Sequence, residues 1–192
     1  MVKITLVDDT DLSIVGTGQQ AYTYGLFSKV ANFAEVVHIT ESLRDPSRLS
    51  WASGTKVVRC LPGKLGVHLC SHTSLSKIIS SAKDSDVIIA ERINGINRWA
   101  PLESRHLRIT FIYQTHGNEI ETSEIVNQKL YVFPIEKYIY KSSDFIIARS
   151  EITLINAIKT YKLRGKRYAV LPPGLRDVHC ANNQAFRDKL RL

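Results

Sequence analysis

Short apolar runs alternate with helix-length segments along this chain, and residues 144–174 are the clearest case. Residues 145–148 and 168–171 are apolar runs suited to strands that are buried on both faces. The segment between them predicts a helix, because Ser150 can cap its first turn and Gly165 can end it. Two strands joined by a single helix must be parallel neighbours, so this stretch predicts a right-handed βαβ unit.

The same alternation continues through the rest of the chain. Further strands are predicted at residues 4–7, 35–39, 56–60, 86–90 and 109–113, and helices at 16–32, 75–83, 119–142 and 182–192. Residues 42–55 are predicted to be irregular, residues 91–108 a loop and a broken helix, and Pro134 should kink or divide its helix. The pattern therefore predicts an α/β, Rossmann-like fold, with a parallel sheet of about seven strands and helices on both faces.

The charge balance adds a preference for anionic partners. The 192 residues include 26 Lys and Arg against 18 Asp and Glu, which gives a formal charge of +8 and a pI near 9.5. A positive net charge of this size favours binding to nucleic acid, phosphorylated substrates or an anionic lipid surface, although it can also serve solubility alone. The densest basic cluster comprises Lys159, Lys162, Arg164, Lys166 and Arg167.

The expected compartment is the cytoplasm, with possible attachment to the membrane face. Three cysteines without a CxxC pair do not suggest a disulfide framework. The N-terminal residues leave no room for a signal peptide, and no apolar run approaches the ~20 residues that span a bilayer.

Ligands of such folds bind beyond the carboxyl ends of the strands, which directs attention to four stretches. These are residues 8–18, 91–94, 114–119 and 172–174, and Glu91, Pro173 and Gly174 are candidate binding residues within them. Asp8 and Asp9 are interpreted as turn residues, since no partner carboxylate is evident in the other loops.

Gly16, Thr17 and Gly18 are predicted to bind a phosphate or sugar oxygen. A glycine-rich turn before a helix presents backbone N–H groups and a positive helix end. With Ala21, the stretch also satisfies the GxGxxA dinucleotide fingerprint, but eight residues separate it from the preceding strand.

His116 is the candidate catalytic residue. It follows a predicted strand end, and Gly117 after it would let the backbone approach a ligand closely. Asn118 and Glu119 extend the loop and could bind hydroxyls or cap the next helix.

Metal chemistry and several hydrolytic chemistries are not favoured. His68, Cys70 and His72 alternate, but this spacing is not a strong zinc signature, so no metal is predicted. The chain also has no GxSxG, P-loop or HExxH motif.

In the order of its motifs the chain resembles the N-terminal half of retaining glycosyltransferases of the GT-B fold, in particular glycosyltransferase family 4. The similar features are the strand and Gly16-Thr17-Gly18, the aspartate-led strand after Ser85, the strand ending in His116-Gly117, and the series Ser143-Asp144, Ser150-Glu151 and Pro172-Pro173-Gly174. Pro173, where the family usually has asparagine, and Arg149, beside Ser150-Glu151, depart from the pattern.

The resemblance implies that residues 1–180 form an acceptor-side domain and residues 181–192 a linker helix toward a donor-binding domain beyond this chain. It implies transfer of a sugar, with retention, from a nucleotide-sugar to an acceptor that could be lipid-linked or phosphorylated. His116 would lie by the transferred sugar, and Gly16 to Gly18 by the donor diphosphate or the acceptor. The nucleotide-sugar is a substrate, no cofactor is implied, and this portion alone should be inactive.

Two alternatives remain at this point. One is a single-domain NAD(P)-binding oxidoreductase that uses Gly16, Gly18 and Ala21. The other is a basic nucleic-acid-binding module, although the chain lacks the aromatic-studded basic strand or recognition helix of such modules.

Overall fold

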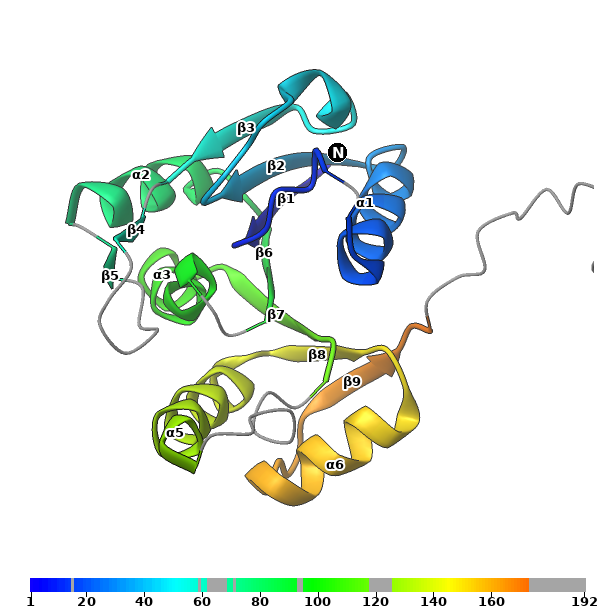
Figure 1. Ribbon diagram of the computed structural model, residues 1–192, viewed down its shortest axis with the longest axis vertical. Coiled ribbons are helices and arrows are strands. Elements are labelled where there is room, and N and C mark those ends of the chain that lie inside the picture. The colour runs from blue at the N-terminus through cyan, green and yellow to red at the C-terminus, as the bar shows by residue number, and fades with distance from the viewer. Residues whose placement is uncertain are drawn as a thin grey trace, which may run out of the picture.

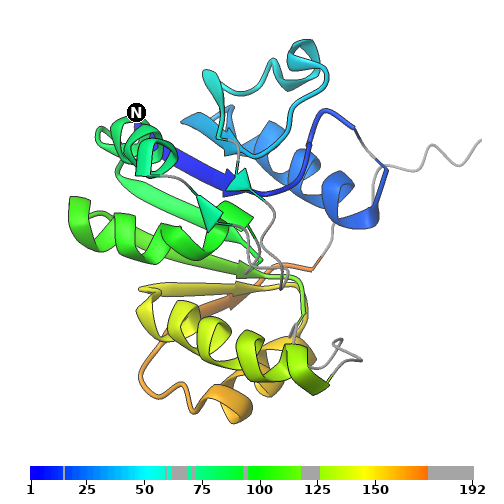
Figure 2. The same cartoon turned by 60° about the vertical axis from the view of Figure 1, so that its left-hand side comes forward.

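The protein is a twisted parallel sheet with helices on both faces (Figures 1 and 2). The computed structural model describes residues 1–14, 16–58, 60–61, 69–70, 72–92, 95–117 and 126–172. Seven strands form the main sheet, in the order β3-β2-β1-β6-β7-β8-β9. They are β1 (Val2–Asp8), β2 (Ala34–Thr40), β3 (Gly54–Val57), β6 (Val87–Glu91), β7 (Thr110–Thr115), β8 (Phe145–Ala148) and β9 (Arg167–Val170).

Every pairing within this sheet is parallel. Between the strands lie α1 (Gly18–Val30), α2 (His72–Ala82), α3 (Ala100–Leu107), α5 (Val126–Ser142) and α6 (Glu151–Tyr161). Two 3-10 helices, η1 (Pro46–Leu49) and η2 (Gly95–Trp99), complete the described elements together with a short antiparallel pair, β4 (Cys60–Leu61) and β5 (Leu69–Cys70). The predicted Rossmann-like class and the seven strands are confirmed.

Two apolar clusters lie on opposite faces of the sheet, and each is closed by its own helices. Leu6, Val36 and Ile89 pack with Phe27 of α1. The larger cluster joins the other faces of β6, β7 and β8 to α2, α3, α5 and α6. In Figure 1, α1 accordingly lies on one side of the central strands, and α2 and α3 on the other.

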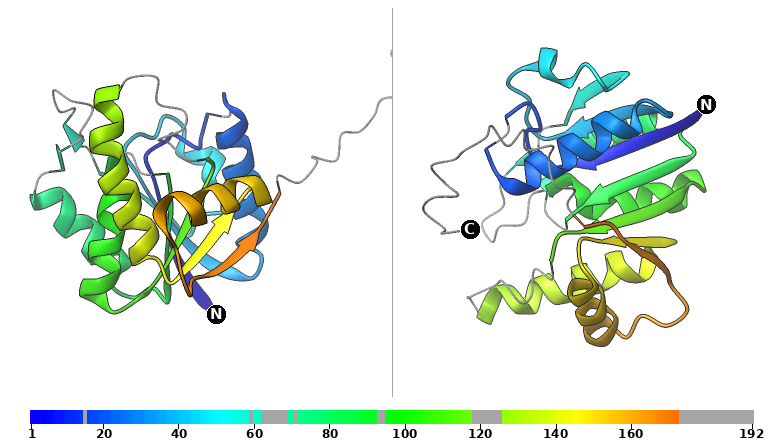
Figure 3. Two further views of the ribbon diagram at one scale, coloured as in Figure 1. Left: turned by 90° about the horizontal axis from the view of Figure 1, so that it is seen from below. Right: turned by 90° about the vertical axis from the view of Figure 1, so that its right-hand side faces the viewer.

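The helices that frame the site have defined ends. Thr17 caps α1, its side chain accepting from the Gln20 N–H, and Ser150 caps α6 through the Thr153 N–H. Helix α5 lies beside α6 (Figure 3, left). Between them Tyr140 stacks on Tyr161, with 4.9 Å between the ring centroids. Caps of this kind satisfy first-turn N–H groups that otherwise have no partner within the helix.

Three local predictions need correction. The third strand occupies residues 54–57 instead of 56–60, because it pairs with β2 from Val37–Gly54 onward. The stretch predicted to be irregular therefore contains η1 and the start of that strand. Pro134 does not divide its helix, since α5 continues from Val126 to Ser142.

Candidate functional site

The site residues meet where the chain reverses its direction of travel across the sheet. From β1 the chain moves to β2 and β3, whereas from β6 it moves to β7, β8 and β9 on the other side. β1 and β6 are neighbours, so the crevice between their carboxyl ends is the topological switch point at which ligands of open α/β sheets bind. Asp8 ends β1, Glu91 ends β6, and His116 follows β7 at this rim.

Glu91 lies at the centre of a hydrogen-bonded cluster. Its Oε2 lies 2.9 Å from Nε2 of His116 and also accepts the hydroxyl of Thr23 on α1. Its Oε1 accepts Nε2 of Gln114 at 2.7 Å. The carboxyl group is fully buried and the imidazole is 9% exposed, so Glu91 lies beneath His116 in the rim.

Burial raises the pKa of Glu91 to about 8, and the charge of Asp9 acts in the same direction. The hydrogen bond from Thr23 and the positive charges of Arg149 and Arg92 oppose this rise. Carboxyl groups with a pKa raised in this way cluster at sites that bind ligands or move protons.

Asp8 is a second buried carboxyl group in the same crevice. Burial raises its pKa well above the ordinary range, and the charges of Glu91 and Asp9 add to the effect. Thr10 donates its backbone N–H to Asp8 at 2.9 Å, as expected of a turn residue. The prediction that Asp8 has no partner carboxylate is nevertheless wrong. Glu91, 83 positions away in the sequence, is close enough for its charge to raise the pKa of Asp8.

Tyr22 and Arg149 extend the cluster toward the first turn of α1. The Tyr22 ring meets the His116 ring edge to face, with centroids 5.7 Å apart. The Arg149 guanidinium lies over the Tyr22 ring, 4.4 Å from the ring centroid. Its Nη2 atom is 3.5 Å from the carbonyl oxygen of Gly18. Within the described residues, Nε of Arg149 is buried and has no hydrogen-bond partner. A positive charge is thus held on the Tyr22 ring, beside the start of α1.

The predicted glycine-rich loop is in place, but it is partly closed by its own helix. Oε1 of Gln20 accepts the N–H groups of Gly16 and Thr17, each at 3.0 Å. Those two donors are engaged within the protein. The N–H groups of Gly18 and Gln19, as first-turn groups, have no acceptor within the helix and point from its positive end.

Two residues after β6 have positive φ angles. Arg92 has φ 65° and Gly95 has φ 53°. A Cβ on Gly95 would lie 1.8 Å from Oε1 of Glu41, which accepts the Ile96 N–H at 2.7 Å. Asn97 then donates to both Asp9 and the Glu91 carbonyl, so this loop ties the ends of β1 and β6 together.

The structure brings His116, Gly117, Glu91 and the Gly16–Gly18 loop to one rim. Asn118, Glu119, Pro173 and Gly174 lie outside the described residues, as do residues 173–192 with the predicted linker helix. Thr23, Gln114, Tyr22 and Arg149 were missed as site residues. Gln114 lies in a stretch that had been singled out, whereas nothing in the local sequence marks Thr23 and Tyr22 on α1.

The described residues also bear on metals, membranes and the basic cluster. They contain no group of three His, Cys, Asp or Glu side chains able to hold a metal ion, and His68 is not among them. No helix in the described ranges is long and apolar enough to cross a membrane. Lys159, Lys162, Arg164 and Arg167 are exposed, whereas Lys166 donates to the carbonyls of Lys141 and Ser143 at 2.7 and 2.6 Å. Lys166 is thus engaged within the fold.

Comparison with known proteins places the fold. No family model and no curated protein sequence matches the chain. Among solved structures, Anabaena HepE in complex with UDP is similar with a TM-score of 0.68 and 14% identity over 99% of this chain and 50% of that one. The lipopolysaccharide outer core galactosyltransferase WaaB matches with a TM-score of 0.60 and 13% identity, over 89% of this chain and 45% of that chain. A UDP-N-acetylglucosamine 2-epimerase matches with a TM-score of 0.52 and 11% identity, over 88% and 47%.

The chain spans about half the length of these proteins. At such low identities the likeness is one of fold, and that fold is the N-terminal half of the GT-B architecture. The predicted GT-B resemblance is confirmed at this level, while placement in family 4 remains a prediction.

Proposed function

We propose that this chain is the acceptor-side half of a glycosyltransferase, which moves a sugar from a nucleotide-sugar to an acceptor hydroxyl. The observation that carries the proposal is the His116–Glu91 pair, a 2.9 Å contact between an imidazole and a buried carboxyl group at the switch point of a GT-B-type sheet. HepE, a protein of the same fold, is described in complex with UDP and with UDP and glucose, which supports a nucleotide-sugar as donor.

The proposed reaction proceeds with retention. An oxygen of the acceptor hydroxyl forms a bond to the anomeric carbon on the face from which the nucleotide diphosphate departs, and the bond between that carbon and the diphosphate oxygen breaks. The hydroxyl proton passes to the departing phosphate oxygen, so atoms and charges balance. His116 holds a hydroxyl of the transferred sugar, and Glu91 fixes the orientation of the imidazole through Nε2.

Arg149 and the first turn of α1 are the groups that would bind an anionic part of the donor or acceptor. A guanidinium is suited to phosphate or carboxylate because it presents five donors in a planar fork. Stacking on Tyr22 already holds it in one orientation, so little side-chain freedom is lost on binding. Stabilising the negative charge of the donor diphosphate would also require groups outside this chain. We therefore expect no turnover by this chain alone.

A second element of the proposal concerns attachment to anionic membrane. Lys159, Lys162, Arg164 and Arg167 are exposed around the C-terminal end of α6, and Ile152 and Ile155, in the first half of the same helix, are exposed as well. Basic residues next to exposed apolar side chains are typical of surfaces that lie on anionic bilayers.

The experiment is transfer of radiolabelled sugar from UDP-glucose by the protein carrying this domain, with His116→Ala as the test variant and His106→Ala as the matched control. His106 lies on α3, away from the rim cluster. We expect His116→Ala to lose transfer by at least about 10²-fold with its far-UV spectrum unchanged, and His106→Ala to retain it. Unchanged turnover in His116→Ala would show that His116 takes no part in transfer.

Other outcomes would identify a different function. Interconversion of UDP-sugars without an acceptor would indicate an epimerase, an activity named for another protein of this fold. Tight binding of NAD(P)H by this chain would favour the oxidoreductase alternative. Salt-dependent binding to DNA without binding to anionic vesicles would favour the nucleic-acid module.

A further inference from the structure

Two of the three cysteines lie opposite each other in the short antiparallel pair of β4 and β5. Cys60 of β4 pairs with Cys70 of β5, and Leu61 pairs with Leu69 at the next position of the ladder. The two cysteines are ten positions apart in the sequence, a spacing that matches none of the common metal or redox motifs. The pairing of the strands is therefore what identifies them as partners.

Directly opposite positions of an antiparallel ladder meet the distance requirement of a disulfide. Cα atoms across such a ladder are about 4.5 Å apart in a non-hydrogen-bonded pair and about 5.5 Å apart in a hydrogen-bonded pair. Disulfide-bonded cysteines have Cα atoms roughly 4.4–6.8 Å apart, so both kinds of pair fall within the range. Directly paired residues also share one face of the ladder. Joining Cys60 to Cys70 therefore requires no change in strand pairing.

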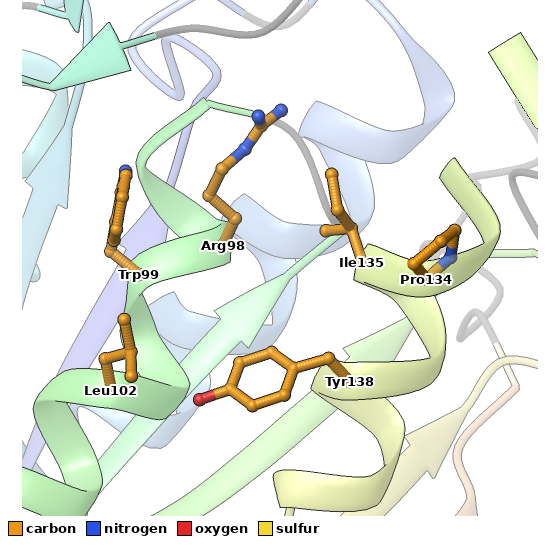
Figure 4. A pocket seen from close by; sticks show the side chains of 6 residues that line it. All are labelled: Arg98, Trp99, Leu102, Pro134, Ile135 and Tyr138. Atoms are coloured by element: carbon orange, nitrogen blue, oxygen red, sulfur yellow. The ribbon is translucent and has the colours of Figure 1, made fainter. Parts of the chain in front are cut away.

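The paired strands lie against an element that reaches the rim of the sheet. Strand β5 contacts both α2 and η2. On η2, Asn97 donates to Asp9 and to the Glu91 carbonyl. Arg98 and Trp99 of the same element border an apolar pocket of about 280 Å³, whose far wall is α5 (Figure 4). A bond that holds β4 to β5 would therefore act next to an element that contributes to both places.

We propose that Cys60 and Cys70 form a reversible disulfide, which fastens β4 to β5 and acts on η2. The oxidant is a small disulfide such as glutathione disulfide. One cysteine thiolate attacks it, forming a mixed disulfide and releasing one glutathione. The other cysteine thiolate then attacks the sulfur of the first cysteine, forming the bond between Cys60 and Cys70 and releasing the second glutathione. The two cysteine sulfurs together lose two electrons, glutathione disulfide gains them, and the two thiol protons end on the two glutathiones.

Such a bond is suited to switching rather than to permanent bracing. In a reducing compartment, such as the cytoplasm expected from the sequence, the disulfides that do form are usually transient and redox-sensing. The bond closes only the segment 60–70, and a short loop restricts the unfolded chain less than a long one does. The folded chain therefore remains able to exist in both redox states.

Tryptic peptides separate the two cysteines, because Lys64 lies between them. Cys60 falls in peptide 60–64, Cys70 in peptide 65–77 and Cys180 in peptide 177–187. The chain is equilibrated in glutathione buffers of increasing oxidised-to-reduced ratio, alkylated with iodoacetamide, digested and analysed by mass spectrometry without reduction. We expect peptides 60–64 and 65–77 to become linked as the ratio rises and to separate again when it is lowered.

Cys70→Ser is the test variant, and Cys180→Ser is its matched control. Cys180→Ser should retain the linked peptides with the same midpoint ratio, whereas Cys70→Ser should form no bond within the chain. Three results would overturn the proposal: a bond from either cysteine to Cys180, bonds only between two copies of the chain, or complete alkylation of Cys60 and Cys70 at every ratio.

Unfolding tests whether the strand pairing, and not closeness in the sequence, forms the bond. In urea that unfolds the chain, the midpoint should shift on the order of tenfold toward a more oxidising ratio, because the ladder no longer holds the two thiols together. An unchanged midpoint would reject the proposal.

Trp99 reports whether the bond is felt at η2. The other tryptophan, Trp51, packs against Tyr24 and Phe27 in the opposite apolar cluster, so a Trp51→Phe background leaves emission from Trp99 alone. We expect this emission to change with the same midpoint as the linked peptides, and to stay constant when Cys70→Ser is added. Constant emission in a chain that forms the bond would reject its action on η2. None of these measurements requires sugar transfer, so their outcome is independent of the proposed function.

Discussion

Replacing Glu91 by glutamine should stabilise the fold at alkaline pH while impairing transfer. In the native chain the buried carboxyl group has a pKa of about 8, against an ordinary 4.5, because burial disfavours its charged form. Glutamine has the same shape and cannot ionise. Its amide can still accept from Gln114 and face His116, as the protonated acid does.

The sign of the pH dependence follows from the direction of the shift. An acid whose pKa is raised on folding keeps the folded chain protonated where the unfolded chain is ionised. The folded state is therefore favoured at low pH and loses stability as the pH rises from about 4.5 through about 8. At about pH 9 the free energy of unfolding is lowered by at most roughly 5 kcal/mol through Glu91, since each unit of pKa shift corresponds to about 1.4 kcal/mol per proton.

Glu103 provides a matched control for this reasoning. It is 3% exposed on α3, and burial alone raises its pKa to about 8 as well. Within the described residues its two carboxyl oxygens have no hydrogen-bond partner. Glu103→Gln should therefore stabilise the fold at alkaline pH as Glu91→Gln does, but it should leave transfer unchanged because Glu103 contacts none of the rim residues described above.

The assay is urea unfolding of the parent and both variants at about pH 5 and about pH 9, together with transfer measured at about pH 7. We expect near-equal stability at the lower pH, a gain of several kcal/mol for both variants at the higher pH, and a loss of transfer on the order of 10²-fold for Glu91→Gln only. A stability difference that is the same at both pH values would show that the folded chain does not hold Glu91 protonated. Equal transfer by both variants would refute its link to His116.

Three further predictions concern Arg149, the basic surface and Gly95. Arg149→Ala should raise the KM for the substrate that carries the contacted anion by about tenfold with the fold intact, and Arg149→Lys should restore little of it; the affected KM identifies donor or acceptor. Replacing the exposed Lys159, Lys162, Arg164 and Arg167 by glutamate should abolish pelleting with anionic vesicles. Lys166→Glu should instead lower the melting temperature, because the Lys166 ammonium donates hydrogen bonds to two carbonyls. Unaltered pelleting of the fourfold variant would reject the proposed membrane surface. Gly95→Ala should destabilise the fold by about 1–3 kcal/mol in urea unfolding, since φ is positive and the new Cβ would collide with Glu41; a neutral effect would mean that the loop relaxes freely.

The fold could be predicted because its signals are local. The βαβ unit around α6 combines apolar strands with a Ser150 cap, and both features act within a few residues. The prediction that Gly165 ends the helix is wrong, because α6 ends at Tyr161 and Lys162 takes the left-handed C-cap position. The third strand was misplaced because residues 54–57 are half-exposed or exposed at the sheet edge and carry little apolar pattern. Its bounds are set by pairing with β2, which local sequence does not encode.

The site could be predicted only in part, because its defining contacts join distant positions. His116 and Glu91 were indicated by their places after strand ends, yet their 2.9 Å contact depends on β6 and β7 being neighbours. Thr23 approaches Glu91 from α1, 68 positions earlier in the chain, and a threonine on a helix has no local feature that marks it. In the sequence Arg149 stands out only as a departure from the motif series, because its partner Tyr22 lies far away in the chain, on α1.

The strand order also explains why the end of β6 is the strongest candidate for the functional site. Helix α1 leaves β1 on one face, and the helices after β6 and β7 leave on the other, so the described connections diverge between β1 and β6. A carboxyl group there is covered by α1 on one side and by η2 on the other, which is the burial that raises the pKa of Glu91. Because the fold loses stability by holding an acid in that place, Glu91 is better explained by what it does to His116 than by packing.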